Sequence, residues 1–385
     1  MKKTQETLRK DDTTKQAVLY TAFELSNKTW KLAFSNGSKV RYVSTDARDL
    51  NKLQAQIAMA KKRFGLNEDV RVVSCYEAGR DGFWLHRYLL SLGIENLVVD
   101  SASIEVNRRK RRTKTDRIDA GKLLVMLMRH YGGEKKMWSV VRVPREEEED
   151  ARNLGRELEV LKRERTMHSN RIKGLLIQQG LEIKGLNVKR FLSELEGMRT
   201  WDDKELPVDF KTRMEREHQR LKMVDEQIRG LKEERKKRVE SGDKACYRQV
   251  AQLMKLRGIG QENSWDFVME FFGWRNFRNR KQVGALAGLT PTPYDSGGSL
   301  REQGISKAGS RHIRTRSVES AWCWLRFQPQ SKLSRWFNKR FAQGGKRMRR
   351  IGIVAVARKL LIELWRYLKD GVVPEGAGLM KGISS

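Results

Sequence analysis

Two carboxylates open a helical stretch in the first half of the chain. Asp116 and Asp119 lie three residues apart, and the residues from Leu123 to Leu127 continue in the apolar pattern of a helix. Positions i and i+3 share one face of a helix, so the two side chains could together bind a hard divalent cation such as Mg²⁺ or Mn²⁺. The same residues could instead serve only to complement the helix dipole.

The residues just before this pair are strongly basic. Six of the eight residues from Asn107 to Lys114 carry a positive charge, namely Arg108, Arg109, Lys110, Arg111, Arg112 and Lys114. Such a run attracts phosphate groups. The sequence therefore places a candidate metal site beside a candidate nucleic-acid-binding segment.

Short strands and helices must position the acidic pair. β-rich runs at 17–23, 29–34 and 40–43 are separated by turn residues and predict two successive hairpins. A helix from Leu50, a strand from Val70 to Cys75, a second helix and a strand at 97–99 follow. The predicted order is β-β-β-α-β-α-β-α.

That order resembles the topology of RNase H and RuvC-like nuclease folds. In those folds acidic residues cluster on the first strand, after the fourth strand and on a late helix. Here the three places hold Glu24, Glu77, and Asp116 with Asp119. Four carboxylates would repel one another strongly unless cations lay between them, and Mg²⁺ is the natural occupant.

The composition points to a polyanionic partner. Lys and Arg number 80 against 48 Asp and Glu, which gives a formal net charge of +32. Nucleic acid is the expected partner of so basic a chain, and an anionic membrane surface is the competing one. The longest apolar run, Ile353–Ala357, is too short to span a bilayer, so we expect no membrane segment.

The length, the N-terminal residues and the cysteines limit the classes of protein to which the chain could belong. With 385 residues the chain has room for two or three domains. The first 16 residues hold no apolar core of the kind that a secretory signal needs, which predicts a cytoplasmic protein. Cys75, Cys246 and Cys323 are scattered too widely for a metal motif or a disulfide framework, so we expect buried free thiols.

Beyond Pro144 the pattern changes to long helices. Apolar residues recur at helical spacing from Leu154 to Leu175, and a heptad runs from Phe210 to Leu231. Two such helices predict an antiparallel coiled-coil hairpin, within one chain or shared between chains. Their many Lys and Arg residues could lie along a nucleic-acid backbone or form an ordinary solvated face.

The last third of the chain combines helices with glycine-containing turns. Leu256–Gly260 resembles a helix-hairpin-helix turn, in which Gly258 and Gly260 would expose backbone N–H groups to a phosphate. Ser296 lies in a Pro/Gly-rich stretch, which predicts a flexible loop that could deliver a hydroxyl group. By itself, a serine before two glycines is more typical of a turn. Basic residues after it are candidates for phosphate binding: Arg301, Lys307, Arg311 and Arg314.

We therefore expect α/β plus α architecture, in five segments. They are a flexible basic arm at 1–16, an RNase H/RuvC-like domain at 17–143, a coiled-coil region at 144–240, a mainly helical domain at 241–372 and a flexible tail at 373–385.

Taken together, the motifs resemble those of the DEDD class of insertion-sequence transposases, which includes Piv/MooV-type invertases and bridge-RNA-guided recombinases. The resemblance runs from about residue 17 to residue 370 and rests on the order and spacing of seven motifs: Phe23–Thr29, Tyr76–Gly79, Lys114–Ala120, Gly258–Gly260, Ala287–Pro291, Ser296–Gly297 and Ile305–Gly309.

This resemblance implies a DNA recombinase with two catalytic parts. The acids Glu24, Glu77, Asp116 and Asp119 would bind Mg²⁺, and Ser296 in a helical transposase domain would act as the nucleophile. The family pattern has Asp where this chain has Glu24, so the metal geometry would differ by one methylene. The resemblance also implies donor and target DNA, a structured guide RNA encoded with the element, and a homodimer or homotetramer.

Two other functions fit the same residues. One is a RuvC-like nuclease or junction resolvase that uses water, in which Ser296 is structural. The other is a non-catalytic scaffold that binds RNA or DNA, which the longer side chain of Glu24 favours.

Overall fold

The computed structural model describes residues 17–104, 116–296 and 299–380, and the chain divides into two compact units, Met1–Val143 and Pro144–Ser385. The predicted basic arm at 1–16 and the basic run Arg108–Lys114 lie outside the described residues. Within the described residues no helix is both long and apolar enough to cross a membrane.

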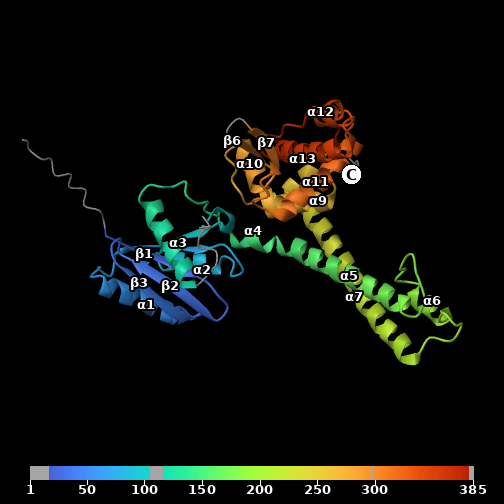
Figure 1. Ribbon diagram of the computed structural model, residues 1–385, viewed down its shortest axis with the longest axis horizontal. Coiled ribbons are helices and arrows are strands. Elements are labelled where there is room, and N and C mark those ends of the chain that lie inside the picture. The colour runs from blue at the N-terminus through green and yellow to red at the C-terminus, as the bar shows by residue number, and fades with distance from the viewer. Residues whose placement is uncertain (1–16, 105–115, 297–298, 381–385) are drawn as a thin grey trace, which may run out of the picture. The chain divides into compact units, whose positions relative to one another are not determined.

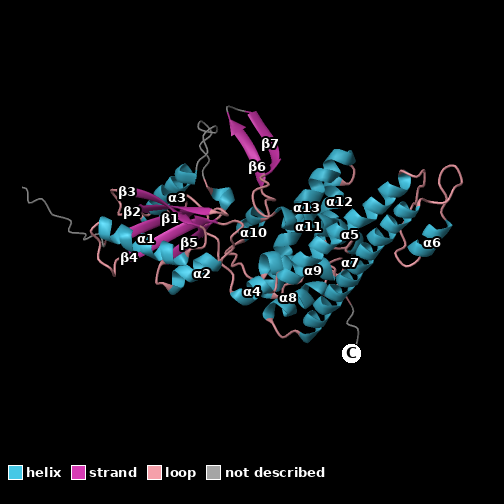
Figure 2. Ribbon diagram, turned by 90° about the horizontal axis from the view of Figure 1, so that it is seen from below, coloured by secondary structure: helices cyan, strands magenta, loops and turns pink. Residues whose placement is uncertain are grey.

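The first unit is built on a five-stranded mixed sheet in the order β3-β2-β1-β4-β5 (Figures 1 and 2). Strands β1, β2 and β3 are antiparallel neighbours, whereas β4 and β5 are parallel to β1. The predicted order β-β-β-α-β-α-β-α is confirmed. The elements are β1 Val18–Glu24, β2 Thr29–Ser35, β3 Val40–Asp46, α1 Leu50–Arg63, β4 Arg71–Glu77, α2 Trp84–Ser91, β5 Glu95–Val99 and α3 Asp116–Tyr131, with a short 3₁₀ turn η1 Ser101–Ser103.

Alternate side chains of β1 enter two different cores. Phe23 joins Leu53 of α1 and Leu89 of α2 on one face of the sheet, whereas Ala22 joins Leu123 of α3 on the other. This two-residue alternation is the pattern of a strand covered on both faces. The small side chains on the α3 face allow that helix to approach the sheet closely.

The second unit is helical apart from one β-hairpin (Figure 2). Its elements are α4 Glu146–Asp150, α5 Asn153–Ile177, α6 Phe191–Gly197, α7 Val208–Ser241, α8 Ala245–Met254, α9 Gln261–Phe267, the π-helical turn η3 Val268–Phe272, α10 Arg280–Leu286, β6 Pro291–Ser296, β7 Ser299–Ile305, α11 Arg311–Phe327, α12 Lys332–Phe341 and α13 Gly345–Asp370.

Helices α5 and α7 lie side by side (Figure 1). Leu158 of α5 packs with Ile228 of α7, whereas Ile172 packs with Met214, so the two helices run antiparallel. A polar layer interrupts the apolar seam. The buried Glu217 carboxylate lies 2.9 Å from His168 Nδ1 and accepts hydrogen bonds from Arg171 at 3.0 Å and Arg220 at 2.8 Å. The apolar heptad positions of α7 are therefore the ones that face its partner helix.

A second core holds the remaining helices of this unit together. It is formed by apolar residues of α8, α9, η3, α11 and α13, among them Trp265, Trp324 and Leu360. The segment after α13, predicted as a flexible tail from residue 373, packs against this body as far as residue 380. The amide of Met380 donates to Lys255 O at 2.7 Å, and Gln328 binds the backbone of Gly378. These hydrogen bonds join the segment to the helical body as far as residue 380.

Candidate functional site

Glu24 and Glu77 occupy the carboxyl ends of two neighbouring parallel strands. The register of β1 on β4 pairs Phe23 with Tyr76, and Glu24 and Glu77 are the next residue of each strand. Glu24 is half-buried and Glu77 is exposed. The sheet therefore brings these two predicted acids to adjacent positions at one edge.

Helix α3 brings the other two predicted acids toward the same edge. Its last residue, Tyr131, contacts Tyr20 near the start of β1, with ring centroids 6.3 Å apart. Its residue Gly121 lies against Tyr42, because a Cβ atom added there would be 2.7 Å from the Tyr42 hydroxyl. The helix therefore runs antiparallel to β1, and its first residue, Asp116, lies toward the carboxyl end of that strand.

Asp116 and Glu24 lie at similar positions along the direction of strand β1. Tyr42 pairs with Ala33, which pairs with Ala22, so Gly121 lies near the level of Ala22. Asp116 lies about 7.5 Å along the helix axis from Gly121, and Glu24 lies about 6.6 Å along the strand from Ala22, from the usual rise per residue.

The four acids fit a magnesium site in donor type but not in side-chain arrangement. All their donors are carboxylate oxygens, which Mg²⁺ prefers. Among the described residues, however, no three His, Cys, Asp or Glu side chains are gathered as metal ligands. One acid is engaged otherwise, since the Asp119 carboxylate accepts a hydrogen bond from Lys122 at 3.1 Å.

Ser296 is the last residue of strand β6, and not part of a loop as predicted. Its backbone pairs with Ser299 of β7, so only residues 297 and 298 connect the two strands. Residues 297 and 298 lie outside the described residues. Ser296 and Ser299 are therefore the last described residue of one strand and the first of the next.

Two glycines of the predicted motifs hold the base of this hairpin. A Cβ atom on Gly288 would lie 2.4 Å from Ala308 O, and one on Gly309 would lie 2.2 Å from Leu286 O. Both glycines have a positive φ, of 66° and 102°. The motifs Ala287–Pro291 and Ile305–Gly309 thus pack backbone to backbone, which no larger residue would permit.

The predicted phosphate-binding residues near the hairpin differ in exposure and in their hydrogen bonds. Lys307 and Arg311 are exposed. Arg314 is half-buried and donates to the carbonyl oxygens of Ala287 and Lys307, at 3.3 and 3.1 Å, so it supports the hairpin base. Arg301 lies in β7.

The predicted helix-hairpin-helix turn lies between α8 and α9 but faces the protein. A Cβ atom on Gly258 would lie 3.2 Å from Cys323 O, and the Arg257 amide donates to Gly378 O. Gly260 is the residue that precedes α9, and the space around it is open. Of the two predicted glycines, only Gly260 therefore lies where a phosphate could approach.

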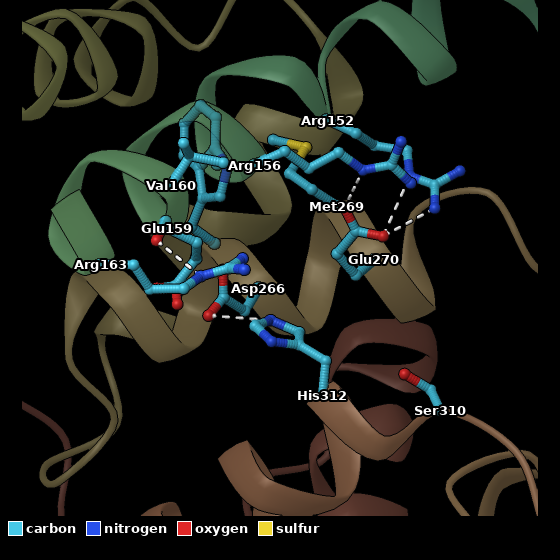
Figure 3. A pocket seen from close by; sticks show the side chains of 12 residues that line it. Arg152, Arg156, Glu159, Val160, Arg163, Asp266, Met269, Glu270, Ser310 and His312 are labelled. Carbon is cyan, nitrogen blue, oxygen red and sulfur yellow. Dashed lines mark hydrogen bonds and ion pairs between the residues drawn. The ribbon is translucent and has the colours of Figure 1, made fainter. Parts of the chain in front are cut away.

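A pocket that the sequence reasoning missed lies between α5, α9 and α11. It has a volume of about 290 Å³, and Figure 3 shows Asp266 and His312 facing each other in it. His312 Nε2 lies 3.3 Å from Asp266 Oδ2, and Arg316 donates to the same oxygen at 2.7 Å. The hydrogen bond with Asp266 raises the pKa of His312, against the effect of burial.

Buried charge at the rim of this pocket is fully paired. Glu270 binds Arg152 at 2.7 Å and Arg156 at 3.1 Å. Burial alone would raise the pKa of Glu270, but these two arginines lower it. Asp266 and Glu270 are carboxylates within the apolar helical run 264–272, and that was the sequence signal that could have located the pocket.

Comparisons with known proteins identify the family of this chain. The family described as "Transposase IS116/IS110/IS902 family" matches residues 250–334, from the middle of α8 into α12. A putative transposase, y4rJ, of Sinorhizobium fredii is 40% identical over 372 residues, which cover 93% of this chain and 94% of the relative.

More distant relatives carry the same description. The transposase for insertion sequence element IS1328 of Yersinia enterocolitica is 27% identical, over 60% of this chain and 66% of the relative. The transposase for insertion sequence element IS1533 of Leptospira borgpetersenii is 24% identical, over 68% of this chain and 77% of the relative. The chain therefore belongs to the IS116/IS110/IS902 family of transposases.

Proposed function

We propose that this transposase cuts and rejoins DNA with Ser296 as the nucleophile and with Mg²⁺ or Mn²⁺ held by Glu24, Glu77, Asp116 and Asp119 in an RNase H/RuvC-like domain. The observation that carries the proposal is the meeting of Glu24 and Glu77 at adjacent strand ends, with the first turn of α3 directed to the same edge. A divalent cation bound there would activate the attacking oxygen and stabilise the leaving one.

The residues of the chain would then have separate tasks. The carboxylates would hold the cation by turning toward it, since Glu24 and Glu77 end their strands and both aspartates lie in the first turn of α3. Asp119 would then exchange its contact with Lys122 for the metal. The extra methylene of Glu24 places its carboxylate farther from the backbone than an Asp would.

The proposed serine step conserves phosphodiester bonds. Ser296 Oγ forms a bond to the phosphorus, the bond from phosphorus to one deoxyribose oxygen breaks, and the hydroxyl proton passes to a base or to solvent as the leaving oxygen is protonated. In the second step a deoxyribose hydroxyl of another strand replaces Oγ. The hairpin supports this role because its glycine-packed base fixes β6, at the end of which Ser296 lies.

We further propose that a guide RNA directs the transposase to its DNA sites. A structured RNA would supply the sequence specificity, and the protein would bind chiefly phosphate groups, as the net charge of +32 favours. Strand exchange requires more than one active site, which favours a homodimer or homotetramer.

The experiment is a cleavage assay on element-end DNA with matched variants. We expect Asp116→Asn, Asp119→Asn and Ser296→Ala to lose at least 100-fold in cleavage rate, whereas Ser299→Ala retains it, because only the first three remove a reacting group. Normal cleavage by Ser296→Ala would assign the chain to the nucleases that use water. Normal recombination by both Asp variants would make it a non-catalytic scaffold.

A further inference from the structure

One long stretch of the chain contains no acidic residue. Between Glu319 and Glu363 there is no Asp or Glu, whereas eleven Lys and Arg residues occur. On α7, by contrast, basic residues alternate with acids, because Glu215, Asp225 and Glu233 interrupt the cations. The charge of this stretch is therefore not balanced locally.

The structure gathers six of these cations at the junction of two helices. Every residue from 342 to 351 is exposed, which covers the link after α12 and the first two turns of α13. We call the cations of this junction the cation patch, which comprises Lys339, Arg340, Lys346, Arg347, Arg349 and Arg350.

Packing explains why the junction keeps this form. Gly352 lies against Phe341 and Phe337, because a Cβ atom added to it would be 2.5 Å from the Phe341 ring. This contact packs α12 against the second turn of α13, whereas residues 345–351 before it are exposed. The six charges are thus held on an ordered part of the fold.

No acidic partner for the cations of the patch lies among the described residues. Within the described part of the chain, none of the six forms an ion pair, whereas Lys332, on the same helix α12, binds Glu375. On the coiled coil, by comparison, Arg165 is paired with Asp225 and Lys162 with Glu262. Six exposed cations close together repel one another, so a polyanion bound across them would remove a cost that the free protein carries.

We propose that the cation patch binds the phosphate backbone of duplex DNA, outside the segment that matches the family. The partner is DNA because the chain is a transposase, and the contact is with the backbone because Lys and Arg dominate the junction. This inference rests on DNA being the substrate, as in the proposed function, but on none of the residues of the proposed chemistry.

The test measures binding of full-length protein to duplex DNA in EDTA, so that cleavage chemistry plays no part. The patch variant is Arg347→Gln/Arg349→Gln/Arg350→Gln, because glutamine preserves helix propensity while it removes charge. The matched control is Arg213→Gln/Arg216→Gln/Lys237→Gln, which removes three exposed charges from α7. Thermal melting establishes that both variants fold.

We expect the patch variant to bind element-end and scrambled duplexes alike on the order of 100-fold more weakly at about 0.15 M salt. The slope of log K against log salt should fall in magnitude by about 2.7, about 0.9 for each lost phosphate contact. The control should bind within about threefold of the wild type.

Three outcomes would overturn the proposal. The first is wild-type DNA binding by the patch variant, and the second is an equal loss in patch and control variants, which would mean that total charge alone matters. The third is a loss confined to structured RNA, with duplex binding unchanged, which would assign the patch to RNA.

Discussion

Substitution of Gly309 by alanine tests whether the base of the β6–β7 hairpin positions Ser296. Gly309 has a φ of 102°, and its added Cβ would lie 2.2 Å from Leu286 O and 2.8 Å from Leu286 C. The backbone conformation costs about 1–2 kcal/mol for an L residue, and the overlap adds about 1–3 kcal/mol. The total local destabilisation is about 2–5 kcal/mol.

The same strand region provides a matched control. Gly304 also has a positive φ, of 87°, but no atom lies within 4 Å of its added Cβ. Gly304→Ala therefore incurs only the conformational cost of about 1–2 kcal/mol. The two variants differ by the overlap alone, about 1–3 kcal/mol, which corresponds to a factor of about 10 to 100 in an opening equilibrium.

Amide hydrogen exchange measures this opening directly. The amides of Ser306, Lys307 and Ser310 donate to carbonyl oxygens of Thr290, Gly288 and Leu286 across the base of the hairpin. We expect them to exchange about 10 to 100 times faster in Gly309→Ala than in Gly304→Ala, with DNA cleavage reduced in the same order. Equal exchange in the two variants would refute the packing argument, and faster exchange with full cleavage would refute the positioning of Ser296 by this base.

Three further predictions concern the second unit. Asp266 raises the pKa of His312, so the stability that this pair contributes is complete below about pH 6.5, the unfolded value, and is lost as the pH rises through the raised pKa. His312→Gln should remove this part of the pH dependence of thermal melting. An unchanged pH profile would contradict the prediction. Glu270→Gln leaves the buried Arg152 without a full counter-charge and should cost about 3 kcal/mol in urea unfolding, whereas Glu134→Gln, which removes an exposed pair with Arg129, should cost far less; equal costs would show that burial does not matter here. Ile172→Ala removes a fully buried side chain between α5 and α7 and should cost about 2–5 kcal/mol, and a loss under 1 kcal/mol would show that this seam contributes little.

The strands and helices of the first unit could be predicted because their local patterns are strong. Alternation places Ala22 and Phe23 in the cores on opposite faces of the sheet, and the helical spacing of Leu53 and Ile57 places both in one of these cores. The order of the strands predicted that Glu24 and Glu77 would lie near each other. The register of β1 on β4, which makes them direct neighbours, is seen only in the structure.

The hairpin and the pocket could not be derived from local patterns. Prolines and glycines from 291 to 298 are typical of loops, yet residues 291–296 form a strand because they pair with Ser299–Ile305. Asp266 and His312 are 46 residues apart in the numbering of the chain and meet only because α9 and α11 pack together. Pairs of this kind depend on tertiary packing, which periodicity does not encode.

The central claim, that Ser296 is the nucleophile, is tested most directly by mapping the covalent adduct. The wild-type protein would be denatured during cleavage of element-end DNA, digested with protease and nuclease, and examined by mass spectrometry. We predict a nucleotide remnant on the peptide that contains Ser296, absent from Ser296→Ala and retained on the same serine in Ser299→Ala. A remnant on another residue, or efficient cleavage with no adduct at all, would contradict the account.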